Sequence, residues 1–388
     1  MDQWFLLLLP LAAIFGWYVG RLKKKSLEPE SSINQHDYFL GLNYLINEQP
    51  DKAVDVFIRM LEVNSDTVET HLALGNLFRR RGEVDRAIRI HQNLIARPQL
   101  DSKQRMQALF ELAQDYLRAG VLDRAERIFL ELIKLDSDVV NSLKSLINIY
   151  QQQKDWQQAI VTAKKLNKLS GAQMDSAIAH YYCELAEQLL NDRRPQQTQE
   201  YLREALSYDK NCARASIILG NLFIAEGEYS KAINAFQCVY DQDAEYISEV
   251  ITLLADCYKK LNLEKEFVVY ITERIAENTR ISSFVLAMAD YINEQHGNVA
   301  AIEYLTEQVH RCLSMRGLER LLSLYINSVT PDVKNKMLLL KEFIDKLAKN
   351  KPIYRCIHCG FSSKTLYWQC PSCKRWNSLK PIHGLEGD

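Results

Sequence analysis

The sequence predicts an all-α protein: a superhelical solenoid of helix hairpins, with an N-terminal transmembrane helix and a small C-terminal metal ribbon with four cysteines. Three observations carry this prediction. A helical pattern of apolar and small residues recurs about every 34 residues through most of the chain. The first twenty residues include a long uncharged stretch, and two C-x-x-C pairs lie near the end of the sequence.

The repeating unit is clearest at residues 71–94, where two amphipathic segments flank Gly82. Their small and apolar positions have helical spacing: Leu74, Gly75, Phe78, Ala87, Ile90 and Leu94. Gly82 interrupts the pattern and predicts a tight turn. Two amphipathic helices cannot bury both faces alone, so each hairpin needs neighbours.

Copies of this unit lie on both sides of it. The clearest are Gly41, Tyr44, Ala53 and Phe57 before it, and Gly220, Phe223, Gly227, Ala232 and Phe236 after it. The period and these positions resemble the tetratricopeptide repeat family, and we expect about nine repeats over residues 37–349. Gly75 is expected where two helices cross closely, because a larger side chain would push them apart.

Residues 3–20 carry no charge and nearly suffice to cross the hydrocarbon core of a membrane as a helix. Basic residues follow at once, at Arg21 and 23–25, and the short N-terminal side has none. The positive-inside rule therefore places the N-terminus outside and the bulk of the chain in the cytoplasm. A cleaved signal peptide is the alternative, but no positive n-region or small-residue cleavage site is visible.

Three small residues of this segment, Ala12, Gly16 and Gly20, share one helix face. Such spacing lets a second membrane helix approach closely, so we expect a contact there. The plainer alternative is that small residues are common in membrane helices.

The expected domains are an anchor at 1–20, a basic stop and linker at 21–36, repeats at 37–349, a metal-binding domain at 350–380 and a tail at 381–388.

Four cysteines define the metal-binding domain: Cys356, Cys359, Cys370 and Cys373. Each C-x-x-C turn points two sulfurs at one centre, and two turns complete a closed tetrahedral site of the structural kind. Gly360 is expected to let the backbone approach a thiolate and donate an N–H to it, whereas His358 is expected to point away. Disulfides fit poorly with a cytoplasmic location.

The two C-x-x-C turns are similar to the metal-binding turns, or knuckles, of rubredoxin, which holds iron. Lys374 stands where the second rubredoxin knuckle has glycine. The short gap between the pairs favours one zinc ion, with iron as the alternative. The other five cysteines are expected to be small buried residues: Cys183, Cys212, Cys238, Cys257 and Cys312.

No motif for catalysis is present: the sequence lacks a phosphate loop, a zinc-protease helix, a nucleophile elbow and a dinucleotide fingerprint. We therefore expect a non-catalytic protein. The net charge of −1 argues against a broad nucleic-acid-binding surface. The candidates for partner binding are Asn76 and Asn221, which follow the crossing glycines, and Arg79 and Arg80 in the densest basic run; a solvated rim is the alternative.

The order of a membrane helix, about nine repeats and a CIHCG…CPSCKRWNSL ending resembles the lipopolysaccharide assembly protein B family of Gram-negative bacteria over the full length. The resemblance implies an inner-membrane adaptor, facing the cytoplasm, that presents the lipid A enzyme LpxC to the FtsH protease. It also implies antagonism by the regulator called PbgA, YejM or LapC, and association with lipopolysaccharide export proteins.

Two other functions remain open at this point. One is electron transfer, with the ribbon carrying iron. The other is nucleic-acid binding through the ribbon, using Lys374, Arg375 and Trp376. The second needs a wider basic surface than the sequence provides.

Overall fold

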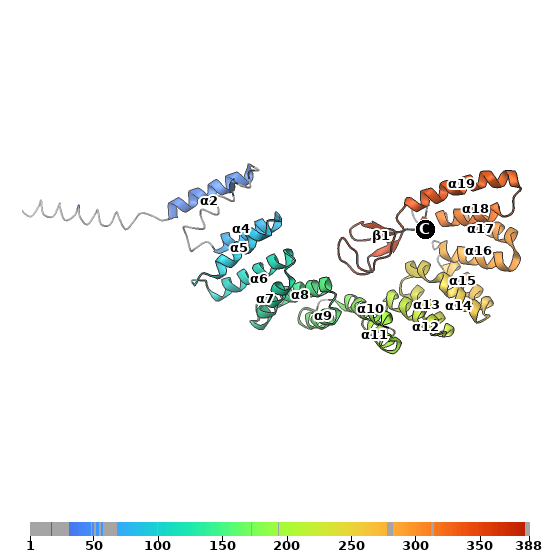
Figure 1. The fold of residues 1–388 in the computed structure, drawn as a ribbon, viewed down its shortest axis with the longest axis horizontal. Helices are drawn as coiled ribbons and strands as arrows, with labels where there is room; N and C mark the ends of the chain where they lie inside the picture. The colour runs from blue at the N-terminus through green and yellow to red at the C-terminus, as the bar shows by residue number, and fades with distance from the viewer. Residues whose placement is uncertain are drawn as a thin grey trace, which may run out of the picture. The chain divides into compact units, whose positions relative to one another are not determined.

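The computed structural model describes residues 17, 31–47, 49, 52–53, 56, 68–98, 100–171, 173–192, 194–277, 282–311 and 314–384. Nearly all of these residues are helical, and the short strands lie at the C-terminal end (Figure 1). The predicted all-α solenoid with a small ribbon is confirmed.

The helices and strands have the following bounds: α2 Ser31–Ile46, α4 Val68–Arg80, α5 Val84–Ile95, α6 Ser102–Arg118, α7 Leu122–Lys134, α8 Val139–Gln153, α9 Trp156–Ser170, α10 Asp175–Asn191, α11 Pro195–Tyr208, α12 Ala213–Ala225, α13 Tyr229–Gln242, η1 Ala244–Glu249, α14 Ile251–Lys260, α15 Glu264–Glu277, α16 Ser282–His296, α17 Asn298–Arg311, α18 Met315–Ile326, α19 Pro331–Asn350, β1 Tyr354–Cys356, β2 Ser362–Ser363 and β3 Leu379–Pro381.

The chain forms two compact units, residues 1–145 and 146–388. In the first unit, α4 pairs with α5 and α6 pairs with α7. The crossing of α4 and α5 is as close as predicted, because a Cβ on Gly75 would lie 2.3 Å from Nε2 of His91. Gly82 has φ +84°, the left-handed conformation that ends α4 and starts the turn.

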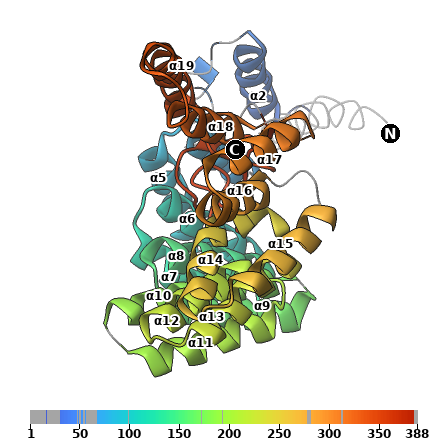
Figure 2. The same ribbon diagram turned by 90° about the vertical axis from the view of Figure 1, so that its right-hand side faces the viewer.

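The second unit continues the same packing through α10/α11, α12/α13, α14/α15, α16/α17 and α18/α19, whose hairpins follow one another in Figures 1 and 2. Its core is rich in aromatic residues, and Phe236, Tyr246 and Phe284 are fully buried. Gly220 repeats the role of Gly75, because a Cβ there would meet the ring of Phe236 at 2.2 Å. This spacing explains why small residues recur in the sequence.

The ribbon is a three-stranded antiparallel sheet in the order β2-β1-β3. Tyr354 of β1 lies opposite Ser363 on one side and Pro381 on the other. Its small core is formed by Tyr354, Cys356, Cys370 and Leu379. The ribbon follows α19 directly and belongs to the same compact unit as α9 to α19.

The predicted anchor at 1–20, with Ala12, Gly16 and Gly20, lies outside the described residues apart from Trp17. In the part of the chain that the structure describes, no helix combines the length and the apolar character needed to cross a bilayer. Helix α2 begins at Ser31, within the stretch expected as linker.

The expectation for the scattered cysteines was wrong at one position. Cys183, Cys212 and Cys257 are buried, but Cys238 is exposed because its place on α13 faces away from the neighbouring helices. Cys312 lies outside the described residues.

Candidate metal centre and the surfaces around it

The four predicted ligands come together. The sulfurs of Cys356 and Cys373 lie 3.7 Å apart, as do those of Cys359 and Cys370, and all four are within 4.8 Å of one another. A tetrahedron with metal–sulfur bonds of about 2.3 Å has edges of about 3.8 Å, so this sulfur cage has the size that a bound ion requires.

The two knuckles have the same backbone turn. Gly360 (φ +75°) donates its N–H to the Cys356 carbonyl at 3.0 Å, and Lys374 (φ +58°) donates to the Cys370 carbonyl at 2.9 Å. This turn brings the backbone N–H of Phe361, the residue after Gly360, to the sulfur of Cys359. Lys374 adopts the left-handed conformation in spite of its side chain.

The sulfurs of the first knuckle accept hydrogen bonds from backbone N–H groups, and the sulfur of Cys356 also lies 3.4 Å from Oγ of Ser378. Burial by itself raises the pKa of Cys356, but Ser378 and the backbone N–H groups of Cys359 and His358 outweigh it and lower the pKa to about 6. The backbone N–H of Phe361 is the main cause of a lowered pKa at Cys359. Burial raises the pKa of Cys370 to about 11. The donors that stabilise thiolates on the first knuckle suit a cation-binding site.

These residues fit one closed metal site. Four sulfurs complete a tetrahedron and leave no position for a substrate, which is the pattern of a structural ion. His358 is exposed and stands outside the sulfur cluster, as predicted. Four thiolates are a ligand set that both zinc and iron accept.

The ribbon packs on the solenoid through two tryptophans. The ring of Trp376 stacks on His180 of α10 at 5.0 Å between centroids and 17° between planes, and it also meets Trp156 and Tyr181. Trp368 lies 4.9 Å from the ring of Tyr246 in η1. We call this contact surface the ribbon dock. It also includes the polar contacts that Tyr246, Glu249, Asp243 and Gln151 make with the ribbon.

Polar contacts surround these rings. The Tyr246 hydroxyl lies 2.8 Å from both the Leu379 carbonyl and Oδ1 of Asn377. Tyr354 donates its hydroxyl to Glu249 at 2.6 Å. Further contacts link Lys380 with Asp243, and Gln369 with Gln151 at 2.6 Å. The ribbon dock thus joins β1, β3 and the second knuckle to α8, α9, α10 and η1.

Two buried groups set the electrostatics of the ribbon dock. Burial, together with the positive charges of Arg214 and Lys380, lowers the pKa of His180 to about 3, so its ring is neutral at physiological pH. Arg214 is also buried, pairs with Glu184 at 2.8 Å, and lies 5.8 Å from the ring centroid of Trp368. Its charge is therefore paired and placed against the ribbon.

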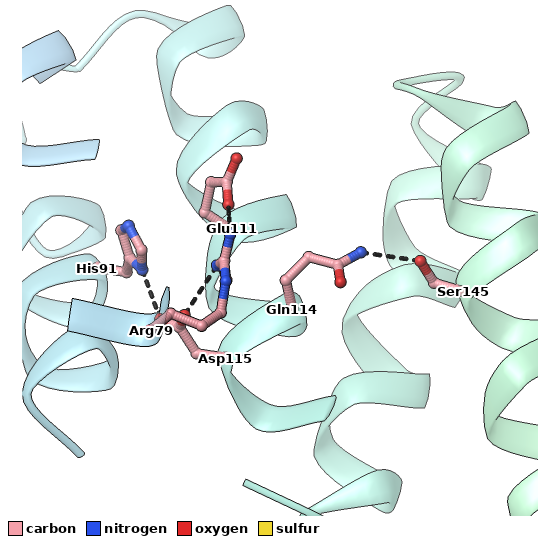
Figure 3. Close-up of polar contacts among 6 residues, drawn as sticks. All are labelled: Arg79, His91, Glu111, Gln114, Asp115 and Ser145. Atoms are coloured by element: carbon pink, nitrogen blue, oxygen red, sulfur yellow. Dashed lines mark hydrogen bonds and ion pairs between the residues drawn. The ribbon is translucent and has the colours of Figure 1, made fainter. Parts of the chain in front are cut away.

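The predicted partner-binding residues occupy different settings. Arg79 of α4 pairs with Glu111 at 2.6 Å and with the buried Asp115 at 2.8 Å, and Asp115 also contacts His91 at 2.5 Å (Figure 3). Arg79 thus connects two successive hairpins. Arg80 beside it and Asn221 on α12 are exposed, whereas Oδ1 of Asn76 is buried with no hydrogen-bond partner.

The second unit also contains a cavity of about 330 Å³ formed by α14, α15, α16 and α18. Its polar lining includes Asp256, Lys259, Asp290, Tyr291, Glu294 and Arg316. Glu294 pairs with Lys259 at 2.7 Å and Asp290 pairs with Arg320 at 2.5 Å. Asp256 and Glu264 give the remaining lining a negative character, so the cavity suits a peptide that presents a positive charge. Sequence reasoning missed this site, because its residues are spread over 69 positions of ordinary helix surface.

The ribbon dock was likewise not predicted from the sequence. Trp368 and Trp376 are the signal that could have revealed it, since large aromatic residues in so small a domain have little core of their own to enter. Their partners His180 and Tyr246 do not lie in a recognisable sequence motif. The side chain of Trp376 is occupied by His180, which leaves less of it for stacking on a base, as the nucleic-acid alternative would require.

The fold and the sulfur cluster define a class: a tetratricopeptide-repeat solenoid protein with a C-terminal four-cysteine ribbon. Family models agree, since two tetratricopeptide repeat models match residues 70–103 and 183–246 respectively, and a model described as rubredoxin metal binding domain matches residues 354–381. Among solved structures, YrrB, a tetratricopeptide-repeat protein with an unusual peptide-binding site, is 16% identical with a TM-score of 0.34, covering 53% of this chain and 97% of its own.

Curated relatives identify the family. Lipopolysaccharide assembly protein B of Escherichia coli strain K12 is 41% identical over 389 residues, covering 100% of both chains. The protein of the same name from Haemophilus influenzae is 35% identical over 398 residues, again covering 100% of both. The chain belongs to the lipopolysaccharide assembly protein B family.

Proposed function

We propose that this chain is a non-catalytic adaptor of the inner membrane that controls lipopolysaccharide synthesis by presenting LpxC to the FtsH protease. The observation that carries the proposal is the end-to-end match to relatives named for lipopolysaccharide assembly, which includes both repeats and ribbon. A solenoid provides extended surface for proteins to bind, and this use requires no catalytic groups.

The acidic cavity of α14–α18 is the place in the second unit that we assign to a protein partner. It is concave, and it combines aromatic and charged side chains such as Tyr291, Asp256 and Arg316. These features suit recognition of a peptide segment by shape and charge. Asn76, Arg79, Arg80 and Asn221 remain predicted partner contacts outside the cavity.

The membrane helix expected at 1–20 would confine this surface to the plane in which a membrane protease works. Confinement raises the effective concentration of cargo near the protease without any new contact. In this proposal the N-terminus is periplasmic and the solenoid cytoplasmic. The regulator called PbgA, YejM or LapC and the lipopolysaccharide export proteins are further proposed partners.

The ribbon is proposed to hold one structural zinc ion through Cys356, Cys359, Cys370 and Cys373. Its role would be to stabilise the ribbon, and through the ribbon dock the middle of the solenoid. A purified protein with iron that loses and regains its colour on reduction and oxidation would favour the electron-transfer alternative instead.

The half-life of LpxC in growing cells tests the proposal. Deletion of the gene should lengthen that half-life, and the intact chain should restore it. The charge reversal Asp256→Lys in the cavity should restore turnover poorly, whereas Glu273→Lys, an equally exposed acidic position outside the cavity lining, should act like the wild type. An LpxC half-life that does not change on deletion would refute the adaptor function.

A further inference from the structure

Helix α19 is the last helix before the ribbon, and only one side of it is packed. Ile344 is buried against Leu322 and Ile326 of α18, and Met337 joins the same cluster. The chain then leaves α19 for the ribbon, so within the described residues no later helix covers its outer side. A terminal helix of a solenoid normally presents a polar outer face.

The outer side of α19 is apolar instead. Leu339, Phe343 and Leu347 are 56%, 55% and 60% exposed, and Leu340 is 52% exposed. The first three follow one another at four-residue intervals, so they form one stripe along the helix. Four neighbouring large apolar side chains on one face differ from the single exposed apolar residues that any surface carries.

Basic residues border this stripe. Lys336 lies one turn before Leu339 and Leu340, and Lys346 lies one turn after Phe343 and pairs with Glu342 at 2.7 Å. From residue 331 to residue 384 the sequence has eleven lysine and arginine residues and three acidic ones, although the whole chain has a net charge of −1. Positive charge is therefore concentrated in α19 and the ribbon.

We propose that α19 lies on the surface of an anionic lipid bilayer, with Leu339, Phe343 and Leu347 in the interface and the neighbouring lysines at the headgroups. A helix with a large apolar stripe bordered by lysine has the character of an interfacial membrane helix. Lysine side chains can extend along apolar surface and keep their ammonium groups at the phosphates.

The charges around the apolar stripe favour an anionic lipid bilayer over a second copy of the chain as its binding partner. A twofold contact through α19 would bring the same lysine-bordered stripe of both copies together, and like charges would face each other. The contact with lipid is separate from the adaptor function and from the helix expected at 1–20. It would give the solenoid a second point of attachment to the membrane. Two attachments fix the orientation of the solenoid, whereas the helix expected at 1–20 alone would only tether it.

Hydrogen–deuterium exchange of the full-length protein tests the proposal. The protein is reconstituted in vesicles of phosphatidylcholine, and in the same vesicles with phosphatidylglycerol added. We expect the amides of α19 to exchange more slowly in the anionic vesicles, while those of α9 and α15 exchange equally in both. The comparison does not depend on LpxC turnover or on the anchor, which would be the same in both preparations.

A matched pair of variants makes the test specific. Leu339→Gln, Phe343→Gln and Leu347→Gln together should abolish the difference between the two vesicles. Val161→Gln, Leu169→Gln and Val269→Gln, which alter apolar residues that are 62%, 56% and 58% exposed on other helices, should leave it intact. Equal exchange of α19 in both vesicles would overturn the proposal. So would protection that grows with protein concentration in detergent alone, which would indicate a second copy.

Discussion

His180 lies under the ribbon, where its neutral ring stacks on Trp376 and faces the positive charges of Arg214 and Lys380. Protonation would place a third cation in this buried region. The ordinary pKa of 6.5 applies in the unfolded chain, and the folded pKa is about 3. The unfolded state therefore binds more protons between these values, and stability falls as the pH falls below 6.5.

We expect acid to weaken the second unit through this residue. Between pH 6.5 and 5.5 the His180 contribution should lower the free energy of unfolding by about 1 kcal/mol. The variant His180→Phe keeps an aromatic ring against Trp376 and should reduce the pH dependence by that amount. Thermal or urea unfolding of both proteins over this range measures it. Identical pH dependence in the two proteins would show that His180 does not titrate in this way.

Single residues also show what the sequence could and could not predict. Gly75 was predictable at a close helix crossing because a repeated small residue at helical spacing has one simple cause, and His91 fills the space beside it. The four cysteines were predictable because their spacing admits few alternatives. Arg79 was harder to interpret, since its partners Glu111 and Asp115 lie in the next repeat, and surface and structural arginines look alike in a sequence.

The ribbon is the element whose stability depends most on the metal. Its sheet is short and its core holds few residues, so metal binding should supply much of its folding free energy. Trp368 and Trp376, the two tryptophans that the ribbon contributes to the ribbon dock, lie in this element. The fold of the ribbon and its attachment to the solenoid should therefore be lost together.

We predict that Cys370→Ser leaves three ligands and releases the ribbon from the solenoid. Trp368 and Trp376 would then move from the ribbon dock into water, and the tryptophan fluorescence should shift to longer wavelength. Helical content should change little, because the hairpins of α10–α18 pack on one another. The matched control is Cys238→Ser, an exposed cysteine outside the sulfur cluster. A metal-free protein with wild-type fluorescence and a protease-resistant C-terminus would contradict this prediction.

At the scale of elements, the sequence predicted hairpins and ribbon separately but not their association. Repeat periodicity describes contacts between neighbours, and the C-x-x-C spacing describes one local site. The ribbon dock joins residues that are 105 to 220 positions apart, such as Tyr354 with Glu249 and Trp376 with Trp156. A repeat period in the sequence does not indicate contacts between residues so far apart. The apolar stripe of α19 was likewise hidden, because an exposed and a buried stripe have the same sequence pattern.

For the whole molecule, the proposed adaptor requires a membrane attachment at a defined place. We predict that replacing residues 3–20 with an unrelated membrane helix keeps the protein in the membrane with folded repeats but slows the turnover of LpxC. The reason is the face formed by Ala12, Gly16 and Gly20, which would contact a membrane partner. Deletion of residues 1–25 should slow turnover further. The measurement is the half-life of LpxC at matched protein levels. Turnover as fast with the foreign helix as with the native one would show that the helix only anchors.

The long sequence separation across the ribbon dock also bears on how the chain matures during synthesis. Helix hairpins form from neighbouring segments, so most of the solenoid can fold while the ribosome is still extending the chain. The surface around His180 and Tyr246 can be covered only after the ribbon has been synthesised and has folded. A nascent or prematurely terminated chain would expose these rings to chaperones and proteases. Completion of the C-terminus thus provides a means by which a cell could distinguish finished molecules from unfinished ones.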